Sequence, residues 1–568
     1  MSHRFLIPLT IIAGSIGLAA TLMPSLAAAT TVGHTAAAHT TSATSHSSAT
    51  EAAISTGRRT LRAPASTSHH LRLAPRAGSA ATDPNPDLGV EFDSADVGAL
   101  GATFQATVTG YDPTTTGGLS ATVAWGDGTS TNYSDISTSP SFTHEYSSTG
   151  DYTITLTVSD GAGDGATSSW NGLQTEGTEF TPYPPTRILD TRKGIGASGP
   201  VGPNGTLKLQ VGNPPIPEPD GIMAAVLNVT VTEATANGFL TVFGDNDSGG
   251  SPSALPQTSN LNFRTGQNVA NLVIVPVGSN GLVDFYNGSS KGSVGVIADV
   301  EGYFSLTETN KFVNVGPSRI LDTRNGTGTG AVKQIPADGN ITLTVAGADK
   351  GAIPANGASA IAMNLTAVDG TRNGVITAYP AGESLPTVSN LNYPAGQTAS
   401  NTAIVPVGTN GQIVFHNNSG GPVDLIADAT GYFTADQVAG GSAYVPFGEP
   451  QRIFDSRPNA LPSGSIVPMS NLGLTGSTSL VLNATVTEPA GNGYLALYPY
   501  DPNNPEALPS TSNLNFLAGQ TVPNLAIVPI GTVPDDSFQP PIYEYGIYLG
   551  GHGSADVILD IFGYFANS

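Results

Sequence analysis

Short stretches of alternating hydrophobic and polar residues recur along most of the chain. In residues 103–108 and 152–158, apolar side chains occupy every second position. This alternation is typical of β-strands with one buried face. Gly, Pro and Asn separate the stretches, as they do at the turns between strands. We therefore predict an all-β protein built from several antiparallel β-sandwiches.

From residue 180 onward, one pattern of residues occurs three times. Its copies open with Arg-Ile-Leu-Asp-Thr-Arg at Arg187 and Arg319 and with Arg-Ile-Phe-Asp-Ser-Arg at Arg452, spaced 132 and 133 residues apart. Each copy continues with Ser-Asn-Leu-Asn, Gly-Gln and Val-Pro-(Val/Ile)-Gly and closes with Gly-Tyr-Phe. Solenoid repeats are only ~20–50 residues long, so each copy is predicted to be a β-sandwich domain with its own core. We place these β modules at 180–306, 311–435 and 443–568.

The segment before the modules, residues 86–175, contains three further motifs. They are Trp-Gly-Asp-Gly at 125–128, His-x-Tyr at 144–146 and Gly-Asp-Tyr-Thr-Ile-Thr-Leu-Thr-Val-Ser-Asp-Gly at 150–161. Together these motifs resemble the PKD domain. The resemblance implies an immunoglobulin-like β-sandwich at this place in the chain.

The same resemblance implies structural roles for four residues. Trp125 would anchor the core, Asp127 would cap a turn, and His144 and Tyr146 would close the entry to a strand; a role of His144 as a base or ligand is the alternative. PKD domains of secreted proteins typically serve as spacers or as modules that bind proteins or carbohydrates. The three-copy pattern resembles a β module of exported proteins from high-GC Gram-positive bacteria, and that resemblance implies no particular activity.

The N-terminal part of the chain predicts export. Arg4 precedes an apolar run, residues 5–22, and the alanines at 27–29 form a small-residue cleavage signal, so residues 1–29 are interpreted as a signal peptide. A transmembrane anchor is the alternative. Residues 30–85 are rich in Ala, Ser, Thr and His and poor in large apolar side chains, which predicts a disordered linker. We expect a secreted, extracellular protein that can associate with the cell surface.

Charge and composition exclude several classes of protein. The formal net charge is −23, with +5 on residues 1–82 and −28 on residues 83–568, and such an acidic body repels nucleic-acid phosphates. The 69 Gly and 43 Pro residues disfavour long helices, and the absence of Cys excludes disulfides and thiolate chemistry. No later apolar run reaches the ~18 residues that span a bilayer, so we expect no membrane span after signal cleavage.

Cationic residues concentrate in the three opening motifs. Six of the 14 Lys and Arg residues after position 82 lie there: Arg187, Arg192, Arg319, Arg324, Arg452 and Arg457. Asp residues recur in the same motifs and before each Gly-Tyr-Phe: Asp190, Asp322, Asp455, Asp299, Asp428 and Asp560. We predict bidentate clamps between these groups that pin the first strand of each module to its last. The alternative is one anion or uronate site per copy.

Aromatic residues near predicted loops are the candidates for carbohydrate stacking, because a sugar ring needs a flat apolar face beside hydrogen-bonding groups. The candidates are Phe243, Tyr286, Tyr379, His416, Tyr498 and Tyr500. Phe263, Tyr393 and Phe516 lie within the Ser-Asn-Leu-Asn strands and are predicted to be core residues.

Recurring polar residues give weaker signals. The Asn residues of the Ser-Asn-Leu-Asn motifs are predicted to satisfy buried backbone groups: Asn260, Asn262, Asn390, Asn392, Asn513 and Asn515. Two acidic loops, 160–164 and 245–247, are weak candidates for Ca²⁺ binding, although neither matches a 12-residue EF-hand loop. No other cofactor is predicted.

The histidine inventory argues against an enzyme. After residue 82 only His144, His416 and His552 occur, each in a different unit, so no two can share a compact site within one domain. Motifs of the H-E-x-x-H, G-x-S-x-G and nucleotide-binding types are absent in their proper context. We expect a non-catalytic protein that binds polysaccharide, cell-wall material or a surface protein through its repeated modules. The alternatives are a passive spacer without a ligand and, less favoured, a glycosidase with two carboxylates.

Overall fold

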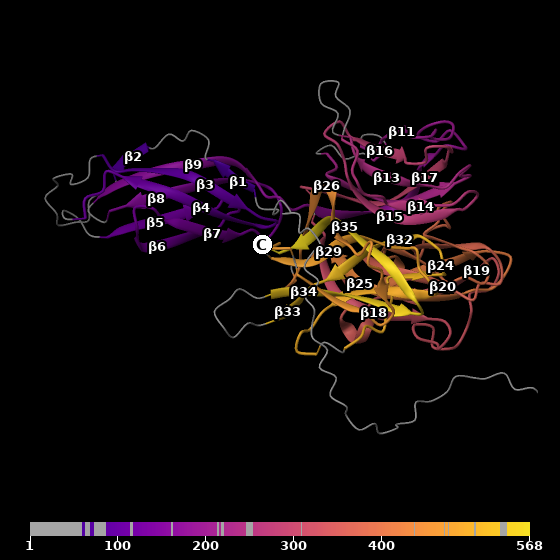
Figure 1. Cartoon of the computed structure of the whole chain (residues 1–568). Helices are drawn as coiled ribbons and strands as arrows, with labels where there is room; N and C mark the ends of the chain where they lie inside the picture. The colour runs from indigo at the N-terminus through magenta and orange to yellow at the C-terminus, as the bar shows by residue number, and fades with distance from the viewer. Residues whose placement is uncertain are drawn as a thin grey trace, which may run out of the picture. The chain divides into compact units, whose positions relative to one another are not determined.

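The computed structural model, shown in Figure 1, describes residues 59–62, 69–72, 87–113, 118–160, 163–212, 215–216, 221–245, 254–307, 309–436, 438–470, 472–474, 476–504, 507–533 and 542–567. Within these residues the chain forms β-strands and, as its only helical elements, two 3-10 turns, η1 (Asp349–Gly351) and η2 (Thr409–Gly411). The predicted all-β class is therefore confirmed. The predicted signal peptide lies outside the described residues.

The first folded unit is a sandwich of two antiparallel sheets. Its main strands are β3 (Gly89–Val97), β4 (Gly101–Thr109), β5 (Leu119–Ala124), β6 (Ser130–Ile136), β7 (Ser141–Glu145), β8 (Asp151–Ser159) and β9 (Asp164–Gln174). Inward-facing side chains of the alternating strands meet between the sheets around Phe104, Trp125 and Trp170. This arrangement is the face-to-face packing of an immunoglobulin-like sandwich.

Two short strands lie inside the segment that we expected to be a disordered linker. They are β1 (Arg59–Arg62) and β2 (His69–Arg72), which pair antiparallel with β3 and β9. The sheet orders become β1-β3-β4-β7 and β2-β9-β8-β5-β6. Strand addition uses backbone hydrogen bonds and needs few apolar side chains, which explains why composition did not predict it. Leu61 also packs against the core of the sandwich.

Each of the three modules is built from eight common strands. Module one has β10 (Glu179–Asp190), β11 (Thr206–Gln210), β12 (Ala224–Thr232), β13 (Gly238–Gly244), β14 (Leu261–Phe263), β15 (Val269–Pro276), β16 (Leu282–Asn287) and β17 (Gly295–Ser305). Module two has β18 (Lys311–Asp322), β19 (Gly339–Thr344), β20 (Ala358–Val368), β21 (Gly374–Pro380), β22 (Leu391–Tyr393), β23 (Ala399–Pro406), β24 (Gln412–Asn418) and β25 (Asp424–Thr434).

Module three has the same strands and two short additions. Its common strands are β26 (Ala443–Asp455), β28 (Ile466–Ser470), β29 (Ser477–Thr487), β30 (Gly493–Pro499), β31 (Leu514–Phe516), β32 (Val522–Pro529), β34 (Ile542–Gly551) and β35 (Ser554–Ala566). The additions, β27 (Leu461–Pro462) and β33 (Gly531–Val533), pair with β35 and β34.

The strand order, which the sequence left open, is identical in the three modules. Numbered by their order in a module, the strands form one sheet in the order 1-8-3-6, as in β10-β17-β12-β15, and a second in the order 2-7-4-5, as in β11-β16-β13-β14. All of these pairings are antiparallel. Two four-stranded sheets with this order make a jelly roll. We call the 1-8-3-6 sheet the inner sheet and the 2-7-4-5 sheet the outer sheet.

Each module has its own hydrophobic core between its two sheets, as predicted. A further cluster draws on the inner sheets of all three modules. It includes three closing-strand residues, Phe304, Phe433 and Phe565, whose ring centroids lie 6.1–6.2 Å apart. Phe180, Phe312 and Tyr444 from the first strands pack around them. The inner sheets are therefore buried on both faces.

Backbone hydrogen bonds join the modules in a closed ring. Phe180 of module one pairs with Asn310, Phe312 of module two pairs with Ser442, and Tyr444 of module three pairs with Thr178. The N···O distances in these bridges are 2.8–2.9 Å. Equivalent residues of each module thus contact the next module around a closed ring, as the subunits of a cyclic trimer do. Here the three modules that form the ring belong to one chain.

Buried asparagines repeat this cyclic pattern at the module boundaries. Three Nδ2···Oδ1 hydrogen bonds of 2.9 Å join Asn401 to Asn228, Asn524 to Asn364 and Asn271 to Asn483. The first Asn of each pair lies on the sixth strand of one module, and the second lies on the third strand of another. Buried amides need such partners, so these bonds select one register between modules.

Candidate binding sites at the module boundaries

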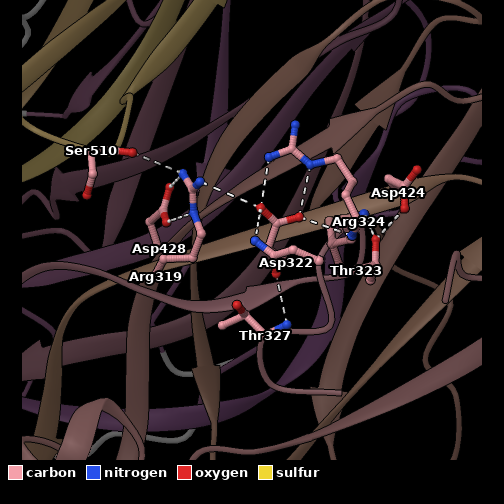
Figure 2. A network of polar contacts seen from close by, with 10 residues as sticks. Arg319, Asp322, Thr323, Arg324, Thr327, Asp424, Asp428 and Ser510 are labelled. Carbon is pink, nitrogen blue, oxygen red and sulfur yellow. Dashed lines mark hydrogen bonds and ion pairs between the residues drawn. The ribbon is translucent and has the colours of Figure 1, made fainter. Parts of the chain in front are cut away.

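The opening motif of module two forms the predicted clamp, shown in Figure 2. Arg319 donates from Nε and Nη2 to Asp428, at 2.9 and 3.2 Å, which ties β18 to β25. Arg324 donates from the same two nitrogens to Asp322, at 2.9 and 2.8 Å. Arg319 also reaches the carbonyl of Ser510 in module three, at 3.4 Å. The clamp therefore lies at the boundary between two modules.

The other two modules contain the same arrangement. Arg187 binds Asp299 at 2.8 and 3.0 Å, and Arg452 binds Asp560 at 2.9 and 3.3 Å. The second pairs are Arg192 with Asp190 and Arg457 with Asp455. At the boundaries, Arg452 reaches the carbonyl of Gln257 in module one, and the amide of Ser389 in module two reaches Asp299 of module one.

The two carboxylates of each clamp have opposite pKa shifts. Hydrogen bonds from Arg324 hold the pKa of Asp322 below its usual range, and burial raises the pKa of Asp428 despite its bonds to Arg319. In the other modules the pKa values of Asp190 and Asp455 are lowered in the same way as that of Asp322. The pKa values of Asp299 and Asp560 are raised by burial, as is that of Asp428.

The charges within each clamp balance, with two guanidinium groups facing two carboxylates. Each guanidinium already holds a carboxylate in bidentate geometry, so a free anion would meet no unbalanced positive charge. The geometry therefore favours the clamp over the anion or uronate site that we kept as its alternative.

Several residues predicted to stack on sugars are buried. Phe243, Tyr379 and Tyr498 lie within β13, β21 and β30 and are only 5–6% exposed. The strands extend through these positions, which we had expected to lie beside loops with their rings accessible. A ring with so little exposed surface offers no face to a ligand, and we correct our expectation for these three residues.

The remaining aromatic candidates are divided. His416 is also buried, in β24, where Nδ1 lies 2.6 Å from Asn340 Oδ1, so the expectation that it stacks on a sugar is wrong as well. Tyr286 in β16 and Tyr500 after β30 are partly exposed. Strand register places Tyr548 of β34 at the position of Tyr286 and His416, an equivalence that motif comparison missed.

The Asn residues of the Ser-Asn-Leu-Asn motifs bind backbone groups as predicted at their first position. The Oδ1 atoms of Asn260, Asn390 and Asn513 accept 2.6–2.7 Å hydrogen bonds from buried amides of the neighbouring strand. The second Asn bonds to nearby Ser hydroxyls: Asn262 to Ser259, and Asn515 to Ser512 and Ser400. Phe263, Tyr393 and Phe516 are core residues.

Two hollows open beside the clamps. One, of about 280 Å³, is lined by Arg319 and Arg324 of module two and by Tyr494, Ser512 and Asn515 of module three. The other, of about 200 Å³, lies at the equivalent boundary between modules three and one. Its lining includes Arg452, Phe239, Gln257, Ser259 and Asn262. Each hollow thus combines an aromatic ring with an arginine and small polar groups.

Sequence analysis missed the aromatic residues of these hollows. Phe239 and Tyr494 occupy the second position of β13 and β30, and module two has Val375 there. Because one copy carries an aliphatic residue, the position does not stand out as a shared aromatic. The signal that could have found them is the Gly-aromatic pair that opens two of the three strands.

The PKD-type motif forms a compact structural cluster. The His144 ring stacks on Trp125, with centroids 4.5 Å apart and planes 2° apart, and its Nε2 lies 2.9 Å from Asp127 Oδ2. Asp127 also accepts hydrogen bonds from the amide and hydroxyl of Thr129, as expected of a turn cap. Burial raises the pKa of Asp127, but hydrogen bonds from Thr129 and His144 outweigh this effect and lower it. These contacts explain His144 without a catalytic or metal-binding role.

The proposed Ca²⁺ loops lie partly outside the described residues, since 161–162 and 246–253 are not described. Asp245 forms a 2.6 Å ion pair with Lys208. Among the residues that the structure describes, no group of three or more His, Asp or Glu side chains could hold a metal ion.

One buried acid breaks the symmetry of the inner sheets. Glu301 in β17 occupies the position of Thr430 in module two and Phe562 in module three. Its carboxyl group accepts hydrogen bonds from Asn390 Nδ2 at 2.6 Å and from the Ile404 amide at 3.0 Å, both in module two. Burial raises the pKa of Glu301 to about 8 despite these bonds.

We expect this acid to make stability depend on pH. Between its ordinary pKa and about 8, the folded chain keeps a proton that the unfolded chain releases, so the free energy of unfolding should fall as pH rises through this range. Glu301→Gln should remove part of that slope, as measured by denaturant unfolding from pH 5 to 9. Glu383→Gln, at an exposed position, is the control. Equal slopes in the wild type and Glu301→Gln would show that Glu301 ionises freely in the folded chain.

With this geometry in place, comparisons with known proteins define the class of the first unit. The family model of the PKD domain matches residues 90–170, which are the first sandwich. The chain therefore carries a PKD domain, as its motifs predicted. No curated protein matches the chain. Among the described residues, no helix is long and apolar enough to cross a membrane.

Two solved structures are similar to the larger part of the chain. They are titled "Life in the extremes: atomic structure of Sulfolobus Turreted Icosahedral Virus" and "The Triple Jelly Roll Fold and Turret Assembly in an Archaeal Virus". Their identities are 14% and 12%, they cover 68% and 69% of this chain and 91% and 90% of their own, and both TM-scores are 0.14. The jelly-roll assignment rests on the strand order and not on these matches.

Proposed function

We propose that this chain is an exported, non-catalytic binding protein whose three jelly rolls act as one body that holds polysaccharide or cell-wall material. The PKD domain and the β modules fit an extracellular modular protein. The observation that carries the proposal is the pair of hollows at module boundaries, each with an aromatic ring, an arginine and small polar side chains. This combination of groups suits sugar rings, which have apolar faces and hydroxyl edges.

Joining three modules in one body gives repetition a physical purpose. Sites held at fixed positions on one chain bind a polymer together, which can raise apparent affinity by ~10²-fold or more when the geometry allows simultaneous contact. The closed ring of module contacts supports such fixed positions. A passive spacer would need neither the closed arrangement of the three modules nor the hollows at their boundaries.

Two other functions have less support. A glycosidase needs a pair of carboxylates that are open to substrate, and the recurring Asp residues are held by Arg side chains. A surface protein is the other candidate ligand, and it would be the favoured partner if no polysaccharide binds.

The proposed function is tested by retention on insoluble polysaccharides. The chain from residue 30, which retains strands β1 and β2, should bind microcrystalline cellulose, chitin, β-1,3-glucan or peptidoglycan, and binding should persist at moderate salt because the hollows carry no net charge. Heat-denatured protein is the control for adsorption. A chain that is washed from all four materials would contradict polysaccharide binding and leave a spacer or a receptor for protein.

A further inference from the structure

We propose that the hollows between modules two and three and between modules three and one each stack one neutral sugar ring, on Tyr494 and on Phe239. The boundary between modules one and two lacks this capacity because Val375 stands at the same position. This inference rests on the proposed function and deepens it, since it names the ligand class and the number of stacking sites.

Glycine prepares both aromatic rings as platforms. Tyr494 lies opposite Gly550 in the sheet, and a Cβ atom at Gly550 would overlap the Tyr494 ring. Phe239 has the same relation to Gly288, whose amide bonds to the Phe239 carbonyl at 2.8 Å. Each aromatic ring therefore packs with one side on the backbone of a glycine, and the same residue lines a hollow.

The residue that lines the hollow and the residue opposite it in the sheet change together among the three modules. Modules one and three pair an aromatic residue with Gly, whereas module two pairs Val375 with Asn418. Aromatic packing on Gly stabilises a sheet by itself. Packing on Gly alone, however, does not require the aromatic ring to line a hollow beside the Arg–Asp clamp of another module.

The polar groups around Tyr494 suit hydroxyl groups better than an anion. Arg324 uses Nε and Nη2 on Asp322 and is 42% exposed, so Nη1 is open to a sugar oxygen. Ser512 and Asn515 lie in the same lining. The two arginines of this clamp are neutralised by Asp322 and Asp428, so the hollow offers hydrogen bonds without net charge.

The size of the hollows limits the ligand. Volumes of about 280 and 200 Å³ fall below the ~300–1,000 Å³ of typical small-molecule pockets. Each hollow therefore suits one ring of a longer chain, and affinity has to come from two rings of one polymer on the same body. A free monosaccharide should bind weakly.

The test compares stacking variants with a matched control in the same chain. On the polysaccharide that retains the wild type, Tyr494→Ala and Phe239→Ala should each weaken binding about tenfold or more, since one of two linked sites is lost. The double variant should be washed off at low salt. Val375→Ala, at the third boundary, should bind like the wild type.

Two further measurements keep the outcomes distinct. Tyr494→Leu preserves apolar packing on Gly550 without a flat ring, so a variant with wild-type melting temperature and weakened binding would separate stacking from folding. Val375→Tyr combined with Asn418→Gly should add a third platform and strengthen binding. Undiminished binding by the folded double variant would overturn the stacking sites while the proposed function stands. Failure of the wild type to bind any of the four materials would overturn both.

Discussion

Replacing Phe433 by Ala is expected to destabilise all three modules together. The Phe433 side chain is fully buried among Phe180, Phe304, Phe312 and Phe565, which come from three modules. Removing a buried Phe typically costs ~3–5 kcal/mol of unfolding free energy. Because this cluster is shared, hydrogen exchange should accelerate in the inner sheets of modules one and three as well as in module two.

A matched substitution in the PKD domain provides the control. Phe142 is equally buried, but its contacts belong to the PKD core. Phe142→Ala should accelerate exchange in that sandwich and leave the inner sheets of the modules protected. Exchange that accelerates in module two alone after Phe433→Ala would mean that the modules are stabilised separately.

Asn401→Ala is expected to have the second large effect. Its Nδ2 donates to Asn228 Oδ1 at 2.9 Å and to the Asn390 carbonyl, and its Oδ1 accepts from the Leu272 amide at 3.0 Å. The substitution leaves buried polar groups of two modules without these partners, at ~1–3 kcal/mol for each unsatisfied group. Because three such groups lose a partner, we expect a loss of at least about 3 kcal/mol in denaturant unfolding.

An exposed asparagine and a double variant sharpen this test. Asn356→Ala, at an exposed site of module two, should change stability by less than ~0.5 kcal/mol. Asn228→Ala combined with Asn401→Ala should cost less than the sum of the single losses, because the two amides share one bond. Strict additivity would show that the contact across the boundary contributes nothing.

The fold was predictable where local pattern decides it. Alternation identified the strands, the period of the motifs identified three modules, and the Arg and Asp residues of the opening motifs form the clamps that their chemistry suggests. Strand order was not predictable, because it depends on pairings between segments that are distant in the sequence, such as Glu179 with Ser305, which no local pattern encodes.

The contacts between modules were not predicted, although the sequence contains a signal for them. All eleven residues of β17 and of β25 are buried, and neither strand shows the alternation expected of a sheet with one solvated face. Asn364 lies in the middle of an equally apolar strand, where a polar side chain needs a buried partner. These features indicate strands that are covered on both faces.

The candidate binding site was predicted least well, because a residue can bind a ligand only if its side chain is exposed, and the sequence does not show which side chains are. Tyr379 and Tyr498 each stand directly before a proline in the sequence, yet the strands continue through them and bury their rings. Tyr494, four residues earlier on the same strand as Tyr498, lines a hollow because a different module supplies its other wall. No property of one module alone reveals that wall.

Differential scanning calorimetry of the chain from residue 30, which retains β1 and β2 of the first sandwich, tests the central claim, that the three modules form one body, most directly. We predict one transition for the PKD domain and one for all three modules, the latter with equal van't Hoff and calorimetric enthalpies. Independent modules would give separate transitions, or a single peak whose van't Hoff enthalpy is about a third of the calorimetric value. Either of these results would contradict a single body and, with it, binding sites that two modules share.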